Sequence, residues 1–474
     1  MTNPESEFTL KDGVLGHSTH LEKLPMTTWM TPKNLNRRDF FKLGAAACAG
    51  SVLPSGNAEA YPEVRRRLCE GDALCGIDIG SDQVRTVLAR VPESSSEAEG
   101  TPQLEVLAVG QAESRYSVQY GEVMRLGRVT EAIREAVEEV EQAAGVEVGS
   151  AFVSVGSRTR RSVNSSGTTS IREPRRRIGE SDVYRAVMAA VPRDGGTAWL
   201  RPPYELLHAL PQEFRVDDLG PTEDPTGWTG EKIGSHVHLV SCPSGTLRRL
   251  EEAVNGAGIR VERLVAAPLA AGYGVLHPED RQEGVVVLDI GSLTTEIAVF
   301  RRGALWHSDL MPTGGRAYTR DLAVGLKTSY GHAEHAKRRC GVTPAENGLD
   351  DDFIELPVAG GGHPKPWRRR LLADVLRRRA ESDLTNIRDR LRQVLRDLPG
   401  TVVLTGGGAN LDGLRDVARL VFGGNVEIRG PRGLTGKPDP ASPPHFATAV
   451  GLCRYGGFAA RGASRNAVNL NDGG

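Results

Sequence analysis

The sequence repeats one pattern twice: Gly76-Ile-Asp78-Ile-Gly80-Ser-Asp-Gln-Val-Arg-Thr-Val-Leu-Ala89, and again Val287-Leu-Asp289-Ile-Gly291-Ser-Leu-Thr-Thr-Glu-Ile-Ala-Val-Phe300. Each stretch starts as a short apolar strand, turns at Asp-Ile-Gly-Ser, and continues with apolar residues at alternate positions. This arrangement predicts a β-hairpin with a tight glycine turn. Two such hairpins in one chain predict two related halves.

The residues of the two turns suit a ligand that carries phosphate. Gly80 and Gly291 let the backbone approach a ligand closely, and the exposed amides of such a turn can cradle phosphate oxygens. Asp78 and Asp289 would then hold a hydrated Mg²⁺ between the two loops. A single hairpin of this kind is as readily explained by an ordinary tight turn as by a ligand site. The indication of a site therefore comes from the presence of two hairpins.

Two further motifs have a composition that fits the same ligand. The segment from Thr401 to Leu414 is a buried-type strand that runs into a triple-glycine turn at Gly406, Gly407 and Gly408, and then into a helix. A planar base or a ribose can lie against such a turn because no side chain blocks it. Glu334 and Lys337 share one face of a short helical segment, where they form either a solvated salt bridge or a ribose contact.

Composition excludes several other classes of protein. The chain has 474 residues, about three domains' worth of sequence. With 39% hydrophobic and 25% charged residues, it has the composition of a soluble globular protein. Its formal net charge of -1 gives no global reason to expect nucleic-acid binding. The six cysteines contain no Cys-x-x-Cys pair, which argues against a zinc cage or a disulfide scaffold.

The two ends of the chain stand apart from this pattern. The segment from Arg37 to Leu53, followed by small residues at 58–60, resembles a twin-arginine export signal. The alternative is an N-terminal extension, with Met26 or Met30 as rival start sites. The apolar part, Leu43 to Leu53, is too short to span a bilayer, which takes about 20 residues. Residues 1–60 and 458–474 are both expected to be disordered.

The order of these motifs resembles the superfamily of actin and heat-shock chaperone ATPases. Five more segments narrow the resemblance to the bacterial cell-division protein FtsA family, and the resemblance runs from about Leu74 to Gly457. These segments are Leu207–Phe214, Asp224–Gly230, Val237–Val240, Pro312-Thr-Gly314-Gly315 and Asp321–Leu326. The resemblance implies an α/β, actin-like (ribonuclease H-like) two-lobed fold with an inserted SHS2-type subdomain called 1C.

The resemblance also implies how the chain divides into domains. An amphipathic helix from Glu131 to Ala144 and a strand from Ala151 to Val155 are expected to belong to the insertion. The expected parts are 74–118 with 194–280 for the first lobe (1A), 119–193 for 1C, 283–325 with 399–457 for the second lobe (2A), and 326–398 for subdomain 2B.

The resemblance further implies ATP with Mg²⁺ as ligand and Asp78 and Asp289 as the metal-binding residues. It also implies polymerisation into filaments, contacts with other division proteins through 1C, peripheral membrane association, and a place at the cytoplasmic face of the cell membrane at the division site. The acidic C-terminal peptide of the tubulin-like protein FtsZ is expected on 2B, with Arg379 at the family's arginine. The expected nucleotide-binding residues are Asp78, Gly80, Ser81, Gln83, Asp289, Gly291, Ser292, Thr294, Thr295, Gly314, Gly315, Glu334, Lys337, Gly406, Gly407 and Gly408.

Three departures from the family's pattern bear on catalysis. Ser292 and Leu293 stand where the second loop usually has glycines, and Gln83 stands where the first loop often has a lysine. Ala267 stands where relatives that hydrolyse ATP well, such as MreB, carry a glutamate that orients the attacking water. Phosphoryl transfer depends on positioning and charge stabilisation, so ATP binding with slow or no hydrolysis is expected, and no catalytic residue is assigned.

Two other functions fit parts of the same pattern. A protein like the pilus-assembly protein PilM would share the inserted module, and a small-molecule kinase would share the actin-like fold. The basic amphipathic helix with which FtsA commonly ends is not visible here. The Arg37–Leu53 segment is therefore a candidate substitute for membrane attachment.

Overall fold

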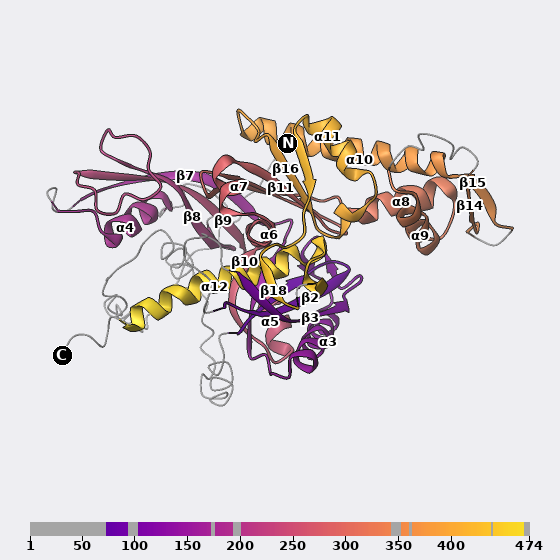
Figure 1. Cartoon of the computed structure of the whole chain (residues 1–474), viewed down its shortest axis with the longest axis horizontal. Coiled ribbons are helices and arrows are strands. Elements are labelled where there is room, and N and C mark those ends of the chain that lie inside the picture. The colour runs from indigo at the N-terminus through magenta and orange to yellow at the C-terminus, as the bar shows by residue number, and fades with distance from the viewer. Residues whose placement is uncertain are drawn as a thin grey trace, which may run out of the picture.

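The computed structural model describes residues 73–92, 103–171, 176–192, 201–342, 352–359, 363–437 and 439–468. The twin-arginine-like segment lies outside the described residues. Two lobes, each built on a β-sheet, form the centre of the molecule, and a smaller domain extends from one end (Figure 1).

The first lobe is built on a six-stranded sheet that contains the first predicted hairpin. Strands β1 and β2 pair antiparallel, with Asp78 opposite Arg85, and β6 pairs parallel with β1. In order across the sheet, the strands are β10 (Arg260–Ala266), β6 (Ser150–Val155), β1 (Ala73–Ile79), β2 (Gln83–Arg90), β3 (Leu104–Glu113) and β18 (Leu434–Gly436).

The second lobe repeats the hairpin in a five-stranded sheet. Strand β11 pairs antiparallel with β12 and parallel with β16, so that Thr405 lies opposite Asp289 and the triple-glycine turn follows beside that carboxylate. In order, the strands are β13 (Ala304–Met311), β12 (Thr295–Arg301), β11 (Val285–Ile290), β16 (Thr401–Thr405) and β17 (Asn425–Ile428).

Two helices, α6 (Ala267–Val275) and α12 (Ala447–Val468), pack closely between the two sheets. Helix α12 lies on β1, β2 and β6, whereas α6 lies on β11, β12 and β13. Glycines permit the close approach of the two helices, since a Cβ atom on Gly451 would lie 1.8 Å from the Ala270 carbonyl oxygen. All nine residues of α6 are buried. The two lobes therefore share one continuous core.

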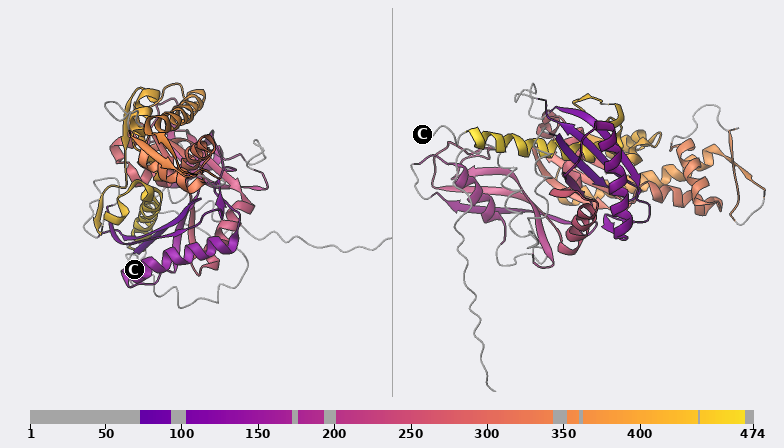
Figure 2. Two further views of the ribbon diagram at one scale, coloured as in Figure 1. Left: turned by 90° about the vertical axis from the view of Figure 1, so that its right-hand side faces the viewer. Right: turned by 90° about the horizontal axis from the view of Figure 1, so that it is seen from below.

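The outer faces of both sheets are covered by amphipathic helices. Helices α3 (Leu126–Ala144) and α5 (Ser244–Gly256) cover the first sheet, and α3 buries Val129, Ile133, Val137 and Val140 at helical spacing. The second sheet shares one core cluster with α8 (Gly315–Leu326), α9 (Tyr330–Cys340), α10 (Arg369–Val394) and α11 (Leu414–Phe422), in which α11 packs on β17 and α10 packs on α11, α8 and α9. The end-on view of Figure 2 shows the orange elements of the second lobe above the first-lobe sheet.

The smaller domain is a three-stranded antiparallel sheet in the order β7-β9-β8, with one helix against it. It lies at the opposite end of the molecule from α8, α9 and the β14–β15 hairpin (Figure 1). Its elements are β7 (Arg161–Ser170), α4 (Glu180–Ala190), β8 (Tyr204–Val216) and β9 (Lys232–Pro243).

These contacts correct the expected boundaries of the insertion, 119–193. The predicted helix and strand exist as α3 and β6, but both belong to the first lobe, because β6 pairs with β1 and α3 covers β3 and β2. Strands β8 and β9, which the range 194–280 assigned to the first lobe, pair with β7 in the inserted domain instead. The sequence pattern of an amphipathic helix is the same whether the helix belongs to the lobe or to an insertion, and the same holds for an apolar strand. The pattern alone therefore assigned both elements to the wrong domain.

The tail expected to be disordered from residue 458 is helical as far as Val468, as the continuation of α12. Alanine and arginine, which are frequent there, favour helix without requiring an apolar stripe. The remaining elements are short: β4 (Val118–Gln119), β5 (Glu122–Val123), α7 (Pro278–Glu283), β14 (Phe353–Leu356), β15 (Lys365–Arg368), and the 3-10 helices η4 (Gly407–Asn410), η5 (Asp439–Ala441) and η6 (Pro444–Phe446).

Candidate functional site

A cavity of about 640 Å³ lies between the two lobes, at the ends of both hairpins. The four motifs from the sequence meet in its wall, although they lie up to 330 residues apart. The expected site residues that line it are Asp78, Gly80, Ser81, Gln83, Asp289, Gly291, Ser292, Thr294, Gly315, Glu334, Lys337, Gly406, Gly407 and Gly408.

Two expected residues lie behind the wall. Thr295 is buried and donates its hydroxyl hydrogen bond to the carbonyl oxygen of Thr313, at 2.9 Å. Gly314 lies against the second turn, where an added Cβ atom would come within 2.5 Å of the Gly291 carbonyl oxygen. Both residues therefore shape the second loop rather than line the cavity.

The two hairpin turns have the same geometry. Gly80 donates its backbone N–H to the carbonyl oxygen of Gln83 at 3.0 Å, and Gly291 donates to Thr294 at 2.8 Å. A Cβ atom on either glycine would lie within about 3 Å of that accepting carbonyl oxygen, at 2.8 Å and 3.0 Å respectively. Leu293, one of the two residues that stand where the family's second loop usually has glycines, does not line the cavity.

The two aspartates are held in place by hydroxyl groups that the sequence did not single out. Ser154 donates to Asp78 Oδ1 at 2.7 Å, and Thr448 donates to Asp289 Oδ2 at 2.8 Å. Burial raises the pKa of Asp78, and burial together with the nearby Asp78 raises the pKa of Asp289 to about 6. Two buried carboxylates that repel each other favour a cation between them.

The triple-glycine turn comes too close to the second hairpin for any larger residue. Gly406 has φ +81°, and a Cβ atom there would lie 2.1 Å from Asp289 Oδ1. A Cβ atom on Gly408 would lie 2.4 Å from Ile290 Cγ2. The turn therefore leaves bare backbone exposed to the cavity, which suits a flat group such as a base.

Glu334 and Lys337 form the salt bridge expected from their spacing, with Lys337 Nζ 2.7 Å from Glu334 Oε2. Burial acts to raise the pKa of Glu334, but hydrogen bonds from Lys337 and Thr319 outweigh it and lower the pKa to about 2. Lys337 Nζ also donates to the carbonyl oxygen of Gly315 at 3.2 Å. The pair thus borders the cavity in a fixed geometry, with charged and hydrogen-bonding atoms at the rim.

Several residues of the cavity wall were not predicted from the sequence. Among them is Glu296, a buried carboxylate with one oxygen that has no hydrogen-bond partner in the described part of the chain. Its Oε2 pairs with Arg160 Nη2 at 2.8 Å, and its Oε1 has no hydrogen-bond partner among the described residues. Burial raises the pKa of Glu296 to about 7, despite the guanidinium of Arg160. An added Cβ on Gly156 would lie 3.0 Å from Glu296 Oε1 and 3.7 Å from the Ala267 side chain, so all three lie together.

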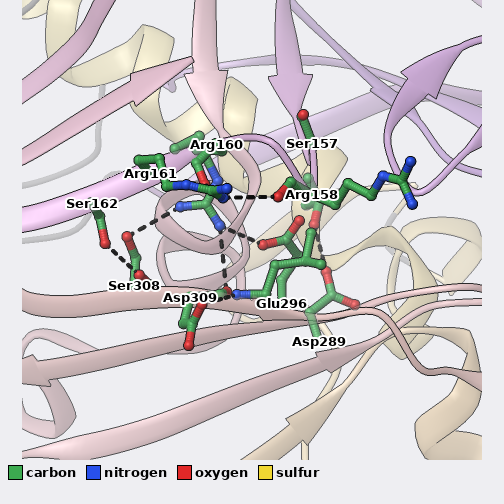
Figure 3. Close-up of polar contacts among 12 residues, drawn as sticks. Ser157, Arg158, Arg160, Arg161, Ser162, Asp289, Glu296, Ser308 and Asp309 are labelled. Atoms are coloured by element: carbon green, nitrogen blue, oxygen red, sulfur yellow. Dashed lines mark hydrogen bonds and ion pairs between the residues drawn. The ribbon is translucent and has the colours of Figure 1, made fainter. Parts of the chain in front are cut away.

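Arg160 connects the cavity to the inserted domain (Figure 3). It precedes β7, and its Nη1 donates to Ser308 Oγ of β13 at 3.2 Å. His238 of β9 also contacts Ser308 Oγ, at 2.9 Å, and burial lowers the pKa of this imidazole to about 3, so it is neutral. Gln212 donates to the carbonyl oxygens of β13 at 3.2 and 3.1 Å. Gln212 and His238 therefore hold the inserted sheet against the second lobe.

A second contact crosses the cavity between the lobes. Arg316 at the start of α8 forms an ion pair with Asp82 in the first turn, and its guanidinium lies 4.9 Å from the centre of the Tyr116 ring. Sequence alone does not pair residues this far apart.

Arg379, the expected partner-binding residue, lies on α10 away from the cavity. Its Nε is 2.6 Å from Asp321 Oδ2 on α8, its Nη1 is 3.6 Å from Asp383 Oδ1, and its side chain is 28% exposed. The guanidinium thus ties α10 to α8 and still reaches the surface.

Similarity to known proteins agrees with this geometry. The model for "Cell division protein FtsA" matches residues 286–451, and FtsA of Pseudomonas aeruginosa is 31% identical over 392 residues, which are 81% of this chain and 89% of that protein. This chain belongs to the FtsA family. FtsA of Agrobacterium fabrum is 34% identical over 388 residues, 80% of this chain and 86% of that protein.

Two further similarities concern the architecture of this FtsA family member. The model for "SHS2 domain inserted in FTSA" matches residues 157–241, which agrees with the domain formed by β7, α4, β8 and β9. The solved structure titled "PilM-PilN type IV pilus biogenesis complex" aligns with a TM-score of 0.56 at 17% identity, over 80% of this chain and 97% of that chain. The predicted actin-like fold with an inserted SHS2 domain is confirmed. Among the described residues, no helix combines the length and the apolar character needed to cross a bilayer.

Proposed function

We propose that this chain binds ATP between its two lobes, polymerises, and links FtsZ filaments of the division ring to the cytoplasmic face of the membrane. Membership in the FtsA family supports the place in cell division. The nucleotide part rests on one observation: two glycine turns with buried aspartates and a bare triple-glycine turn meet around one cavity of about 640 Å³. The two hairpin turns would hold the triphosphate, and the triple-glycine turn would leave room for the base.

Mg²⁺ fits this cavity through its hydration shell. Asp78 and Asp289 are the residues that would hold it, and among the described residues no cluster of three or more His, Cys, Asp or Glu side chains offers a fuller set of protein ligands. Mg²⁺ commonly keeps several waters and binds through one or two carboxylates plus substrate phosphates. When bound, it would neutralise phosphate charge.

Hydrolysis is slow in this proposal because Ala267 lines the cavity where a glutamate would orient water. Glu296 lies nearby, but one of its oxygens is held by Arg160. Loss of a positioning group costs orders of magnitude in phosphoryl transfer. Nucleotide then serves as a structural ligand that stabilises the closed form by its binding free energy.

Calorimetric titration with ATP and Mg²⁺, run beside a phosphate-release assay, tests the nucleotide part. Binding with little release is expected. Lys337→Gln should weaken binding, whereas Arg339→Gln, an exposed position on the same helix outside the cavity wall, should leave it unchanged. Rapid turnover would contradict slow hydrolysis, and the absence of binding would remove ATP from the proposal.

The FtsZ contact is assigned to the surface around Arg379. The exposed part of its guanidinium, with the exposed Arg378 beside it on the same helix, offers positive charge to an acidic peptide. Co-sedimentation with FtsZ should fall for Arg379→Gln and weaken with salt, while Arg415→Gln on α11 should not change it. Binding that does not depend on the FtsZ C-terminal peptide would count against this surface. Liposome flotation with and without residues 1–60 tests the membrane part.

A further inference from the structure

The side chain of Arg85 enters the nucleotide cavity from the first hairpin at a point that none of the motifs marked. It lies on β2 directly opposite Asp78 of β1 and opposite Gln111 of β3. Residues opposite one another on antiparallel strands project from the same face of a sheet. All three residues line the cavity, so this face of the sheet forms part of its wall.

Among the described residues, the guanidinium of Arg85 forms no direct ion pair, although three carboxylates act on its charge from a distance. Its Nη2 donates to the neutral Gln83 Oε1 at 2.7 Å, and its Nε is buried without a hydrogen-bond partner. Within the part of the chain that the structure describes, no carboxylate forms an ion pair with it inside 4.0 Å. A cation that is partly buried without an ion pair is costly, and an anion entering the cavity would relieve that cost.

The position of Arg85 relates it to the two aspartates. Burial lowers the pKa of Arg85, and the charges of Asp78, Asp289 and Asp82 act in the opposite direction, although none of them forms an ion pair with it. The charge of Arg85 also reaches across the cavity to His445, whose pKa is lowered to about 4 chiefly by burial and further by this arginine. Arg85 therefore places a fixed positive charge in the region where a cation between the two aspartates is expected.

Gln83 and Arg85 are two residues apart on one strand and therefore share a face. The first turn lacks a lysine at Gln83, and the structure places a cation two positions later, hydrogen-bonded to that same glutamine. The charge that the turn lacks is thus present in the cavity, on a side chain whose planar fork suits phosphate oxygens.

We propose that Arg85 contacts the phosphates of the bound nucleotide and supplies part of the charge compensation otherwise given by Mg²⁺, so that nucleotide affinity depends only weakly on Mg²⁺. This inference rests on the proposed binding of ATP in the cavity. It assigns phosphate binding to Arg85 and gives Mg²⁺ a secondary part in that binding.

Calorimetric titration of the full chain with ATP, once with excess Mg²⁺ and once with EDTA, measures that dependence. For the unmodified protein the dissociation constant should rise less than about fivefold in EDTA, a difference of about 1 kcal/mol. Arg85→Gln should weaken binding in EDTA by more than about tenfold and make binding strongly dependent on Mg²⁺. Arg85→Lys, which keeps the charge without the fork, should lie between the two.

Arg90→Gln is the matched control, because Arg90 lies on the same strand but outside the cavity and pairs with Glu105 on the surface. It should bind ATP as the unmodified protein does in both buffers. Thermal midpoints of all variants should agree within a few degrees, which separates lost binding from lost folding.

Two results would overturn the inference. A loss of about a hundredfold or more in EDTA for the unmodified protein, with Arg85→Gln binding equally well in Mg²⁺, would show that the metal alone carries the phosphates. That result leaves ATP binding itself intact. If the unmodified protein binds no ATP in either buffer, both the inference and the proposed nucleotide function fall.

Discussion

Replacement of Arg160 by methionine tests the junction between the cavity and the inserted domain. Arg160 and Glu296 form an ion pair at 2.8 Å, and their side chains are only 2% and 7% exposed. Methionine is apolar and unbranched, so it fills much of the arginine's space without its charge. The variant therefore removes the charge while keeping most of the packing.

The expected loss is about 3–5 kcal/mol of unfolding free energy, the usual cost of removing one partner from a buried pair. We expect a loss of unfolding free energy near the upper end of that range. The reason is that Oε1 of Glu296 already has no hydrogen-bond partner among the described residues, and Oε2 would lose its partner. The hydrogen bond from Arg160 to Ser308 is lost as well. A second substitution that removes the stranded charge, Arg160→Met with Glu296→Leu, should recover most of the loss.

The loss should also depend on pH, with a sign fixed by Glu296. Its pKa in the folded protein is about 7, above the ordinary value of 4.5, and removal of Arg160 raises it further. The folded state then binds more protons than the unfolded state between these values, so stability is fully present below about pH 4.5 and is lost as the pH rises through the folded pKa. Arg160→Met should be closest to the unmodified protein near pH 5 and furthest from it near pH 8.

Guanidinium denaturation at pH 5, 6.5 and 8, followed by circular dichroism, measures the stability. Hydrogen exchange across β7 and β13 locates the loss. Because the chain has several domains, the first transition is the relevant one. Arg161→Met, at the exposed neighbouring position, should change stability by less than about 0.5 kcal/mol. A loss below about 1 kcal/mol for Arg160→Met at pH 8, or a double variant as unstable as the single one, would refute this reasoning.

Three other substitutions probe the packing and the cavity. Arg454→Met removes two hydrogen bonds, at 2.7 and 2.8 Å, from a buried guanidinium to the last carbonyls of α6, and should cost about 2–3 kcal/mol in thermal denaturation. Gly451→Ala forces a methyl group to within 1.8 Å of an α6 carbonyl oxygen and should cost about 1–3 kcal/mol, whereas Gly325→Ala, with open space around it, should be neutral or stabilising. Arg316→Ala removes the ion pair across the cavity, so small-angle scattering should show a more open protein and ATP affinity should fall a few-fold.

Motifs that depend on local chemistry could be predicted from the sequence. The two hairpins follow from a strand, a glycine turn and an alternating strand, and the triple-glycine turn follows from a buried strand that ends in glycines. All are present, and their residues meet around one cavity. The residues that determine each of these motifs lie within about ten positions of one another, so each motif can be recognised without knowledge of the rest of the chain.

Residues whose role depends on distant partners could not be predicted. Arg85 had a weak signal, since it shares a strand face with Gln83, but only the fold shows that this face lines the cavity. Glu296 alternates within β12 like any strand residue, and nothing in the sequence pairs it with Arg160. The boundaries of the insertion failed for the same reason, because the membership of β6 in the first sheet is a long-range pairing.

The inserted domain is connected to one lobe by the chain and to the other by polar contacts. Its first strand follows β6 and its last strand leads into α5, both of the first lobe, whereas Arg160 and Gln212 bind β12 and β13 of the second. These contacts are buried, so breaking them would leave unpaired polar groups at a cost of about 1–3 kcal/mol each. Glu296 stands both in the cavity wall and at this junction, so one side chain belongs to the candidate site and to the contact that positions the inserted domain.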